Sequence, residues 1–217
     1  MKAFVSLLSV VALVMALSAC GVGENAKPAK ALPLEINGTL ADTDTPPNSS
    51  AAISAHVDGN TEEPLLAQGT LDGTNITITL TDPDDVDSAN LFDIKAIFEN
   101  ICDVSTEPAN TKFAAVQNFN VGTGYLKLTD SQDPGGSGSV GDTTYMYWLS
   151  DQVATVQGTC DGHQVQLDLV RGWNLVAVTT EGDGNAELSV KSVSNPTSAA
   201  QWRLVSTVQE AVVHTGN

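Results

Sequence analysis

Few side chains in this sequence have the type and spacing that catalysis requires. His56, His163 and His214 share no metal-ligand spacing, which disfavours zinc chemistry. The Ser/Gly cluster in residues 134–139 lacks the strand–elbow–helix context of a G-x-S-x-G nucleophile. The sequence also has no phosphate-binding glycine loop and no dinucleotide fingerprint. We therefore expect a protein that is not an enzyme and that uses no cofactor.

Carboxylates are plentiful, and calcium is the cation that hard oxygen ligands favour. One tight cluster comprises Asp82, Asp84, Asp85 and Asp87. A second, smaller group lies in residues 183–187, where a hairpin turn is the simpler interpretation. Neither has the twelve-residue spacing of an EF-hand loop. The first cluster is thus a weak calcium candidate, and the alternative is a solvated acidic loop whose carboxylates lie near the positive end of a following helix.

The N-terminus has the pattern of an export signal. Lys2 is followed by an apolar run that ends in Leu17-Ser18-Ala19-Cys20, and this run is shorter than the roughly 20 residues a membrane-spanning helix needs. The pattern resembles the bacterial lipobox. That resemblance implies cleavage before Cys20, a diacylglycerol on its thiol and an acylated α-amine, with residues 1–19 as signal peptide and 20–31 as lipidated tether. Gly21 resembles lipoproteins passed to an outer membrane, so we expect that membrane where the cell has one.

Two further cysteines, Cys102 and Cys160, would then lie in a compartment where disulfides persist. A bond between them would close a long loop and stabilise the fold by about 4 kcal/mol in the chain-entropy model. Two buried free thiols are the alternative. Without a C-x-x-C spacing, a redox role is disfavoured. Cys160 would face His163 across a hairpin, and we interpret this pair as a half-exposed histidine beside a bridge.

The tryptophans offer a test between two kinds of surface. Trp148, Trp173 and Trp202 could form a sugar-stacking platform, although single tryptophans in a chain with only 5% aromatic residues more often belong to the core. An exposed Trp148 or Trp202 beside polar side chains would indicate glycan binding. Buried tryptophans would indicate a scaffold.

Composition bounds the remaining possibilities. The chain has 217 residues, of which 41% are hydrophobic, so it can bury a core. Its 26 Asp and Glu against 9 Lys and Arg give a formal charge of −17, which repels nucleic acid and anionic lipid headgroups. The abundance of Val, Thr, Asn, Asp and Gly is typical of short strands and tight turns.

Two Asp-Gly pairs predict hairpins whose register can be counted. Around Asp72-Gly73, Leu71 should pair with Thr74 and Ala67 with Ile78, so that one face is apolar. Around Asp161-Gly162, Cys160 should pair with His163 and Val156 with Leu167. The other expected strands alternate similarly, and they are Leu34–Ile36, Ile53–Val57 (with His56 on the polar side), Phe113–Val121, Tyr125–Leu128, Tyr145–Leu149, Leu175–Val178 and Leu188–Val193.

The predicted fold is mainly β, an antiparallel β-sandwich or two small stacked sandwiches, with one short helix. Ser88 could cap a helix over residues 89–101, because Leu91, Ile94, Phe98 and Ile101 recur at helical spacing. The helix would separate a small N-terminal β unit, 32–87, from a larger C-terminal one, 88–217. The alternative is one continuous sandwich with the helix at a corner.

Residues 90–205 resemble uncharacterised secreted and lipid-anchored proteins of Deinococcus-type bacteria. The matching positions are Cys102, Cys160, Gly172-Trp173-Asn174 and Trp202. This resemblance implies an envelope location and brings no known activity. Residues 32–87 are similar in strand pattern to small carboxypeptidase-regulatory or prealbumin-like sandwiches.

We therefore expect a non-enzymatic, lipid-anchored cell-envelope protein that acts as a structural or protein-interaction module. The alternative is a ligand-binding lipoprotein for calcium, a glycan or peptidoglycan. The expected partners are the membrane, through the N-terminal lipid, and an envelope protein, with no nucleic acid. A hydrolase would need a histidine within hydrogen-bond reach of a serine or carboxylate in a cleft.

Overall fold

The computed structural model describes residues 31–42, 44–47, 49–57, 64–94, 102–135, 139–160, 163–181 and 187–206. These residues form a mainly β fold of the sandwich-like class, as the sequence predicts. Among them, no helix is long and apolar enough to cross a membrane. The predicted signal peptide (1–19) and most of the predicted tether (20–31) lie outside the described residues.

The strands are short and follow one another closely. They are β1 (Glu35–Thr39), β2 (Ala51–His56), β3 (Leu65–Asp72), β4 (Asn75–Leu80), β5 (Phe92–Asp93), β6 (Cys102–Glu107), β7 (Lys112–Val116), β8 (Phe119–Val121), β9 (Gly124–Thr129), β10 (Thr143–Ser150), β11 (Ala154–Cys160), β12 (His163–Leu169), β13 (Gly172–Glu181), β14 (Glu187–Val193) and β15 (Gln201–Ser206). Two 3-10 turns, η2 (Pro83–Asp85) and η3 (Ser88–Asn90), separate β4 from β5.

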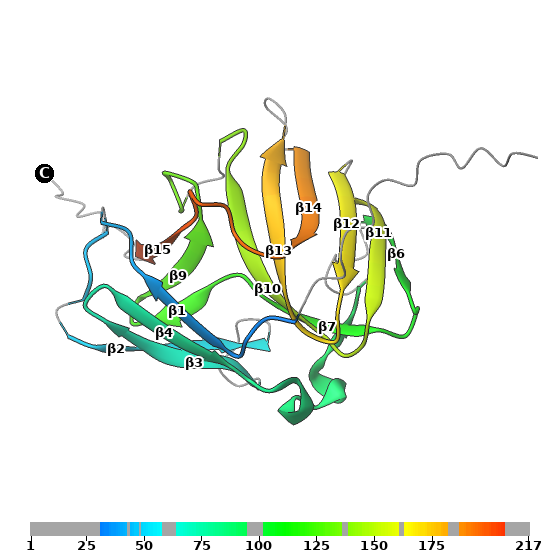
Figure 1. Ribbon diagram of the computed structural model, residues 1–217, viewed down its shortest axis with the longest axis horizontal. Helices are drawn as coiled ribbons and strands as arrows, with labels where there is room; N and C mark the ends of the chain where they lie inside the picture. The colour runs from blue at the N-terminus through cyan, green and yellow to red at the C-terminus, as the bar shows by residue number, and fades with distance from the viewer. Residues whose placement is uncertain are drawn as a thin grey trace, which may run out of the picture.

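The strands join in the order β1-β4-β3-β2-β8-β9-β10-β13-β14-β12-β11-β6, while β15 pairs with β9, and β7 pairs with β10 and β5. Paired strands run antiparallel except β12 and β14, which are parallel. In Figure 1, the β1–β4 group occupies the lower left, and the strands from β10 to β6 stand to its right. The sheet therefore bends strongly between these two groups.

β10 and β13 form a wall with a hydrophobic core on each face. β10 pairs with β13 along its whole length, while its other edge is shared between β9 and β7. Tyr147 and Leu175 face the first core, whereas Trp148 and Val176 face the second. Because both faces are covered, both strands read as nearly continuous apolar runs.

The first core crosses the expected boundary at residue 87. It combines Leu71 and Ile78 from the N-terminal hairpin with Tyr147 and Trp173 from the wall. β2 also pairs with β8, which joins the two expected units in one sheet. The ranges 32–87 and 88–217 therefore share the first core, whereas the second core contains only residues of the C-terminal range.

The two predicted hairpins have different outcomes. Around residues 161–162 the register agrees with the prediction, from Cys160 opposite His163 to Ala154 opposite Leu169. In the first hairpin the predicted register is wrong, because the turn is Gly73-Thr74 rather than Asp72-Gly73. This shift places Leu71 opposite Ile76, two buried apolar side chains, and keeps the same residues on the apolar face.

The predicted helix over 89–101 is wrong at its N-terminal end. Ser88 does not cap a helix, because it is the first residue of the 3-10 turn η3, and β5 follows at once. The apolar spacing of Leu91 and Ile94 instead reflects burial of the two side chains in different cores. Residues 95–101 lie outside the described residues.

One predicted strand is two. The range Phe113–Val121 divides into β7 and β8, since β7 pairs with β10 and β5, whereas β8 pairs with β2 and β9. Phe113 packs in the second core and Phe119 in the first, so the chain changes sides between them.

Candidate functional site

The acidic residues 82–87 act as caps and ion-pair partners. Asp82 accepts a hydrogen bond from the backbone N–H of Asp84 at 3.0 Å, which caps η2. Asp87 accepts from the N–H of Ala89 at 2.9 Å, which caps η3. Asp84 forms an exposed ion pair with Arg171. Within the described residues, no three Asp, Glu, His or Cys side chains converge as metal ligands would, so this geometry gives the calcium candidate Asp82, Asp84, Asp85 and Asp87 no support.

The tryptophans lie inside the molecule. Trp148, Trp173 and Trp202 are 2%, 1% and 5% exposed, respectively. Trp173 also donates from Nε1 to the carbonyl oxygen of Thr81 at 2.8 Å. These side chains are therefore core residues and do not present a stacking platform for sugars.

The Gly-Trp-Asn sequence holds the start of β13. Asn174 is 2% exposed, and its side-chain amide donates to the carbonyl oxygens of Val170 and Gly172 at 2.9 and 2.8 Å. Its Oδ1 accepts from the N–H of Val170 at 2.9 Å. Asn174 thus replaces backbone partners where the chain turns from β12 into β13, which gives this motif a structural role.

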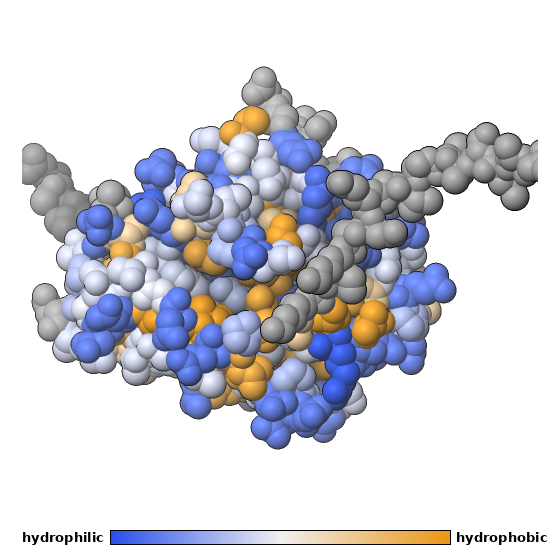
Figure 2. All heavy atoms as spheres, viewed as in Figure 1, coloured by the Kyte–Doolittle hydropathy of each residue, from blue (hydrophilic) through white to orange (hydrophobic). Residues whose placement is uncertain are grey.

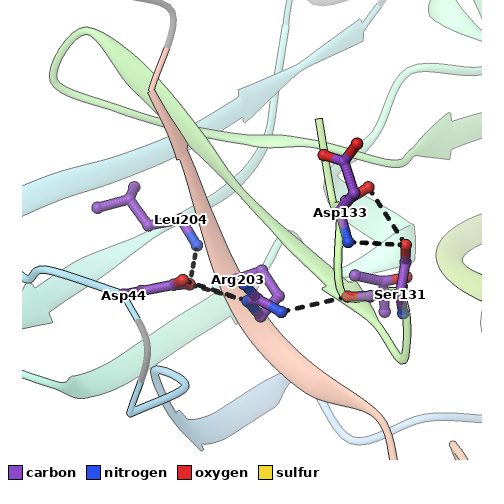
Figure 3. Close-up of polar contacts among 6 residues, drawn as sticks. Asp44, Ser131, Asp133, Arg203 and Leu204 are labelled. Carbon is purple, nitrogen blue, oxygen red and sulfur yellow. Dashed lines mark hydrogen bonds and ion pairs between the residues drawn. The ribbon is translucent and has the colours of Figure 1, made fainter. Parts of the chain in front are cut away.

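A buried ion pair fastens an N-terminal loop to the last strand. Asp44 and Arg203 have side chains that are each 9% exposed, and Nε of Arg203 lies 3.2 Å from both carboxylate oxygens of Asp44. Oδ2 of Asp44 also accepts from the N–H of Leu204 at 2.7 Å, and Nη1 of Arg203 donates to the carbonyl oxygen of Ser131 at 3.2 Å. Figure 3 shows these contacts from three separate segments meeting at Arg203.

Ser131 extends this polar network to the loop before β10. Its Oγ donates to Oδ2 of Asp142 at 2.7 Å and accepts from the N–H of Asp133 at 3.2 Å. The backbone N–H of Ser139 donates to the same Asp142 oxygen at 2.7 Å. The Ser139 N–H and the Ser131 hydroxyl, in that order, hold the pKa of Asp142 below its usual value. Asp142 therefore stabilises the loop as a carboxylate.

An open groove of about 520 Å³ lies between β1 and the segment that leads into β15. One side is formed by Glu35–Thr39 and the other by Ser194–Pro196, Ala200 and Gln201. The floor contains Leu128, Tyr147, Leu175 and Trp202. Figure 2 shows the face on which β1 lies in front, where apolar residues gather across the middle among hydrophilic ones. The groove has the size of a binding pocket.

The aromatic part of the floor is rigidly packed. Tyr147 and Trp202 stack with ring centroids 6.4 Å apart and an interplanar angle of 7°, and Phe119 packs edge-on against both. Burial raises the pKa of Tyr147, so its hydroxyl stays neutral. The edge of the Trp202 ring lies against Gly38, where a Cβ would overlap Nε1. These ring faces are thus occupied by one another.

The remaining predicted site residues are only partly placed. Cys102 and Cys160 are directly opposite in the pairing of β6 with β11. Cys20, the group at 183–186, residues 136–138 and His214 lie outside the described residues.

Sequence reasoning missed both the groove and the buried ion pair. Asp44 and Arg203 are far apart in the chain, and no motif links them. The one indication of the ion pair in the sequence is Arg203, a charged residue between the apolar residues Trp202 and Leu204.

Comparison with known proteins gave no match. No family model matched the chain, and no match was found among the curated proteins or the solved structures.

Proposed function

We propose that this chain is a lipid-anchored protein of the bacterial cell envelope that serves as a non-enzymatic protein-interaction module. The observation that carries the anchoring is the sequence Leu17-Ser18-Ala19-Cys20 after a short positive and apolar segment. A formal charge of −17 opposes adsorption to anionic lipid, so a covalent lipid on Cys20 is the means of attachment.

The polar side chains described above have structural roles, as expected of an interaction module. Asp44, Arg203 and Asn174 are engaged in bonds that hold loops and strands together. The open groove beside β1 is the feature best suited to a partner. The ligand-binding alternative for a glycan lacks support, because all three tryptophans are buried.

We also propose a disulfide between Cys102 and Cys160. These residues are paired at the end of the β6–β11 ladder. Directly opposed residues in an antiparallel ladder have Cα atoms about 4.5–5.5 Å apart, which lies within the range that a disulfide accepts. The bond would fasten β6, a terminal strand of the sheet order, to β11. Cys102 is the first residue of β6, so the bond would hold the start of that strand.

Radiolabelled palmitate tests the proposed anchoring. The full-length chain is expressed in a bacterium that processes lipoproteins, and cells are separated into membrane and soluble fractions. We expect the wild type to carry label in the membrane fraction, and Cys20→Ala to lose both label and membrane attachment. Cys102→Ala is the matched control and should keep both. Retention of Cys20→Ala in membranes, whether cleaved or uncleaved, would contradict lipid anchoring.

Affinity capture tests the proposed role as an interaction module. The lipidated chain is cross-linked in intact cells and captured from solubilised envelope. An envelope protein that is captured by the wild type and not by an unrelated lipoprotein is the expected result. Hydrolysis of an envelope substrate by the purified chain would instead overturn the non-enzymatic proposal.

A further inference from the structure

One edge of β1 faces the groove and has hydrogen-bonding groups that the β1–β4 ladder does not use. In that ladder, Glu35 pairs with Thr79 and Asn37 with Thr77. The bonds from the N–H of Leu80 to Leu34 and from the N–H of Leu40 to Thr74 show that even-numbered residues bond to β4. The backbone N–H and C=O groups of Glu35 and Asn37 therefore point to the opposite edge, which lines the groove.

The ends of this edge are fixed. The N–H of Leu32 donates to the carbonyl oxygen of Trp173 at 2.9 Å, and the N–H of Ala41 donates to that of Trp202 at 2.9 Å. Leu40 and Trp202 form a parallel bridge, beyond which β1 and the segment before β15 separate. The slot beside β1 is about 17 Å long at 3.3 Å per residue, enough for about five extended residues.

The floor and far side suit an extended chain. Leu128 and Leu175 offer apolar contacts to side chains that point down, at every second residue of a strand. Asn195 and Gln201, which are polar, also line the groove. A strand in the slot could thus bond to β1 on one edge while its alternate side chains bury apolar surface.

We propose that this groove binds an extended, cationic peptide segment of a partner protein by adding it as a strand to the edge of β1 that no described strand occupies. The inference rests on the proposed function and deepens it by naming the class of partner. Added strands gain affinity from backbone hydrogen bonds and specificity from pockets for alternate side chains. The peptide carries apolar residues at alternate positions, with Lys or Arg outside them.

Charge supports a cationic partner. Glu35 is the carboxylate that lines the groove, and the whole chain has a formal charge of −17. Opposite charge on the peptide would speed association and favour this partner over acidic segments. A sugar is less suited, because the faces of Tyr147 and Trp202 already stack on each other.

Peptide selection tests this inference. The full-length chain, purified in detergent, is used to select from a phage library of random 12-residue peptides, and the enriched peptides are synthesised. We expect binding by fluorescence polarisation for peptides with alternating apolar residues, flanking Lys or Arg and no Pro in the central run. Methylation of two alternate backbone nitrogens of the peptide should weaken binding by about tenfold or more when these nitrogens belong to the set that faces β1.

A matched pair of variants localises the binding. Ala200→Trp fills the groove and should abolish peptide binding, whereas Ala52→Trp makes the same change at an exposed position of β2 and should leave it unchanged. Hydrogen exchange of the wild type gives a second measurement that needs no variant. The amides of Glu35 and Asn37 should become protected when the peptide is added.

Three results would overturn the inference. The first is that Ala200→Trp and the wild type select the same peptides. The second is that hydrogen exchange at Glu35 and Asn37 is unchanged when the peptide is bound. The third is that no peptide binds, whereas a tetramer of N-acetylglucosamine binds to the wild type and not to Ala200→Trp. Palmitate labelling through Cys20 is measured separately. A failed groove experiment with intact labelling therefore refutes the peptide site alone.

Discussion

Replacing Asp44 by alanine removes the carboxylate from a buried ion pair and leaves its partner without compensation. Arg203 would keep its bond to the Ser131 carbonyl, but its Nε would lose both contacts at 3.2 Å, and the N–H of Leu204 would lose its 2.7 Å acceptor. With side chains 9% exposed, water reaches these groups poorly. Removal of one partner from a buried pair costs about 3–5 kcal/mol. For a domain of this size, the melting temperature should fall by about 6–20 °C.

The assay is urea unfolding of the full-length chain, followed by circular dichroism, with thermal unfolding as a second measurement. Asp93→Ala is the control, because the Lys112–Asp93 pair is 36% and 61% exposed and should contribute about 0–1 kcal/mol. The double variant Asp44→Ala/Arg203→Met should lose less stability than the sum of its single variants, since it leaves no unpaired charge. If Asp44→Ala is within about 1 kcal/mol of the wild type, like Asp93→Ala, the reasoning about the buried pair is refuted.

Three further predictions follow from individual contacts. Gly38→Ala should destabilise the fold and perturb Trp202 fluorescence, because a Cβ would overlap the edge of that ring; an unchanged emission spectrum would contradict this packing. Asp142→Asn should make the free energy of unfolding fall less steeply below about pH 4. A carboxyl whose pKa is lowered in the folded state stabilises the fold above its ordinary pKa and loses this contribution as pH falls. Parallel acid titrations of the two proteins would show the prediction to be wrong. Mass spectrometry without reduction should find Cys102 linked to Cys160, and free thiols at both positions would eliminate the proposed bond.

The second hairpin shows where local sequence is sufficient. Asp161-Gly162 supplies a two-residue turn, and the register counted outward from it places Val156 opposite Leu167, as observed. Around Asp72-Gly73, a turn one residue later also preserves the alternation. The choice between the two was decided by packing, since only the observed register places Leu71 opposite Ile76.

The segment after residue 87 shows where local pattern misleads. Leu91 and Ile94 are three residues apart, as on one face of a helix, yet they pack into different cores. Helical spacing indicates burial on a single face. The same spacing also occurs where an extended chain passes between two cores, and the sequence does not distinguish the two cases. The same passage explains why the expected strand Phe113–Val121 is divided into β7 and β8.

The β class, most of the strands and the acidic character of this protein can be predicted from its residues alone, because alternation, turn residues and charge are local or additive properties. The sequence also predicts the lipid anchor, which depends on a contiguous motif ending in Cys20. The groove and the Asp44–Arg203 pair arise from the folded arrangement of the strands. Both depend on β15 meeting the N-terminal segment, where Trp202 contacts Leu40 and Ala41. Such contacts between distant segments are selected by the closure of the whole sheet, and no local pattern specifies them.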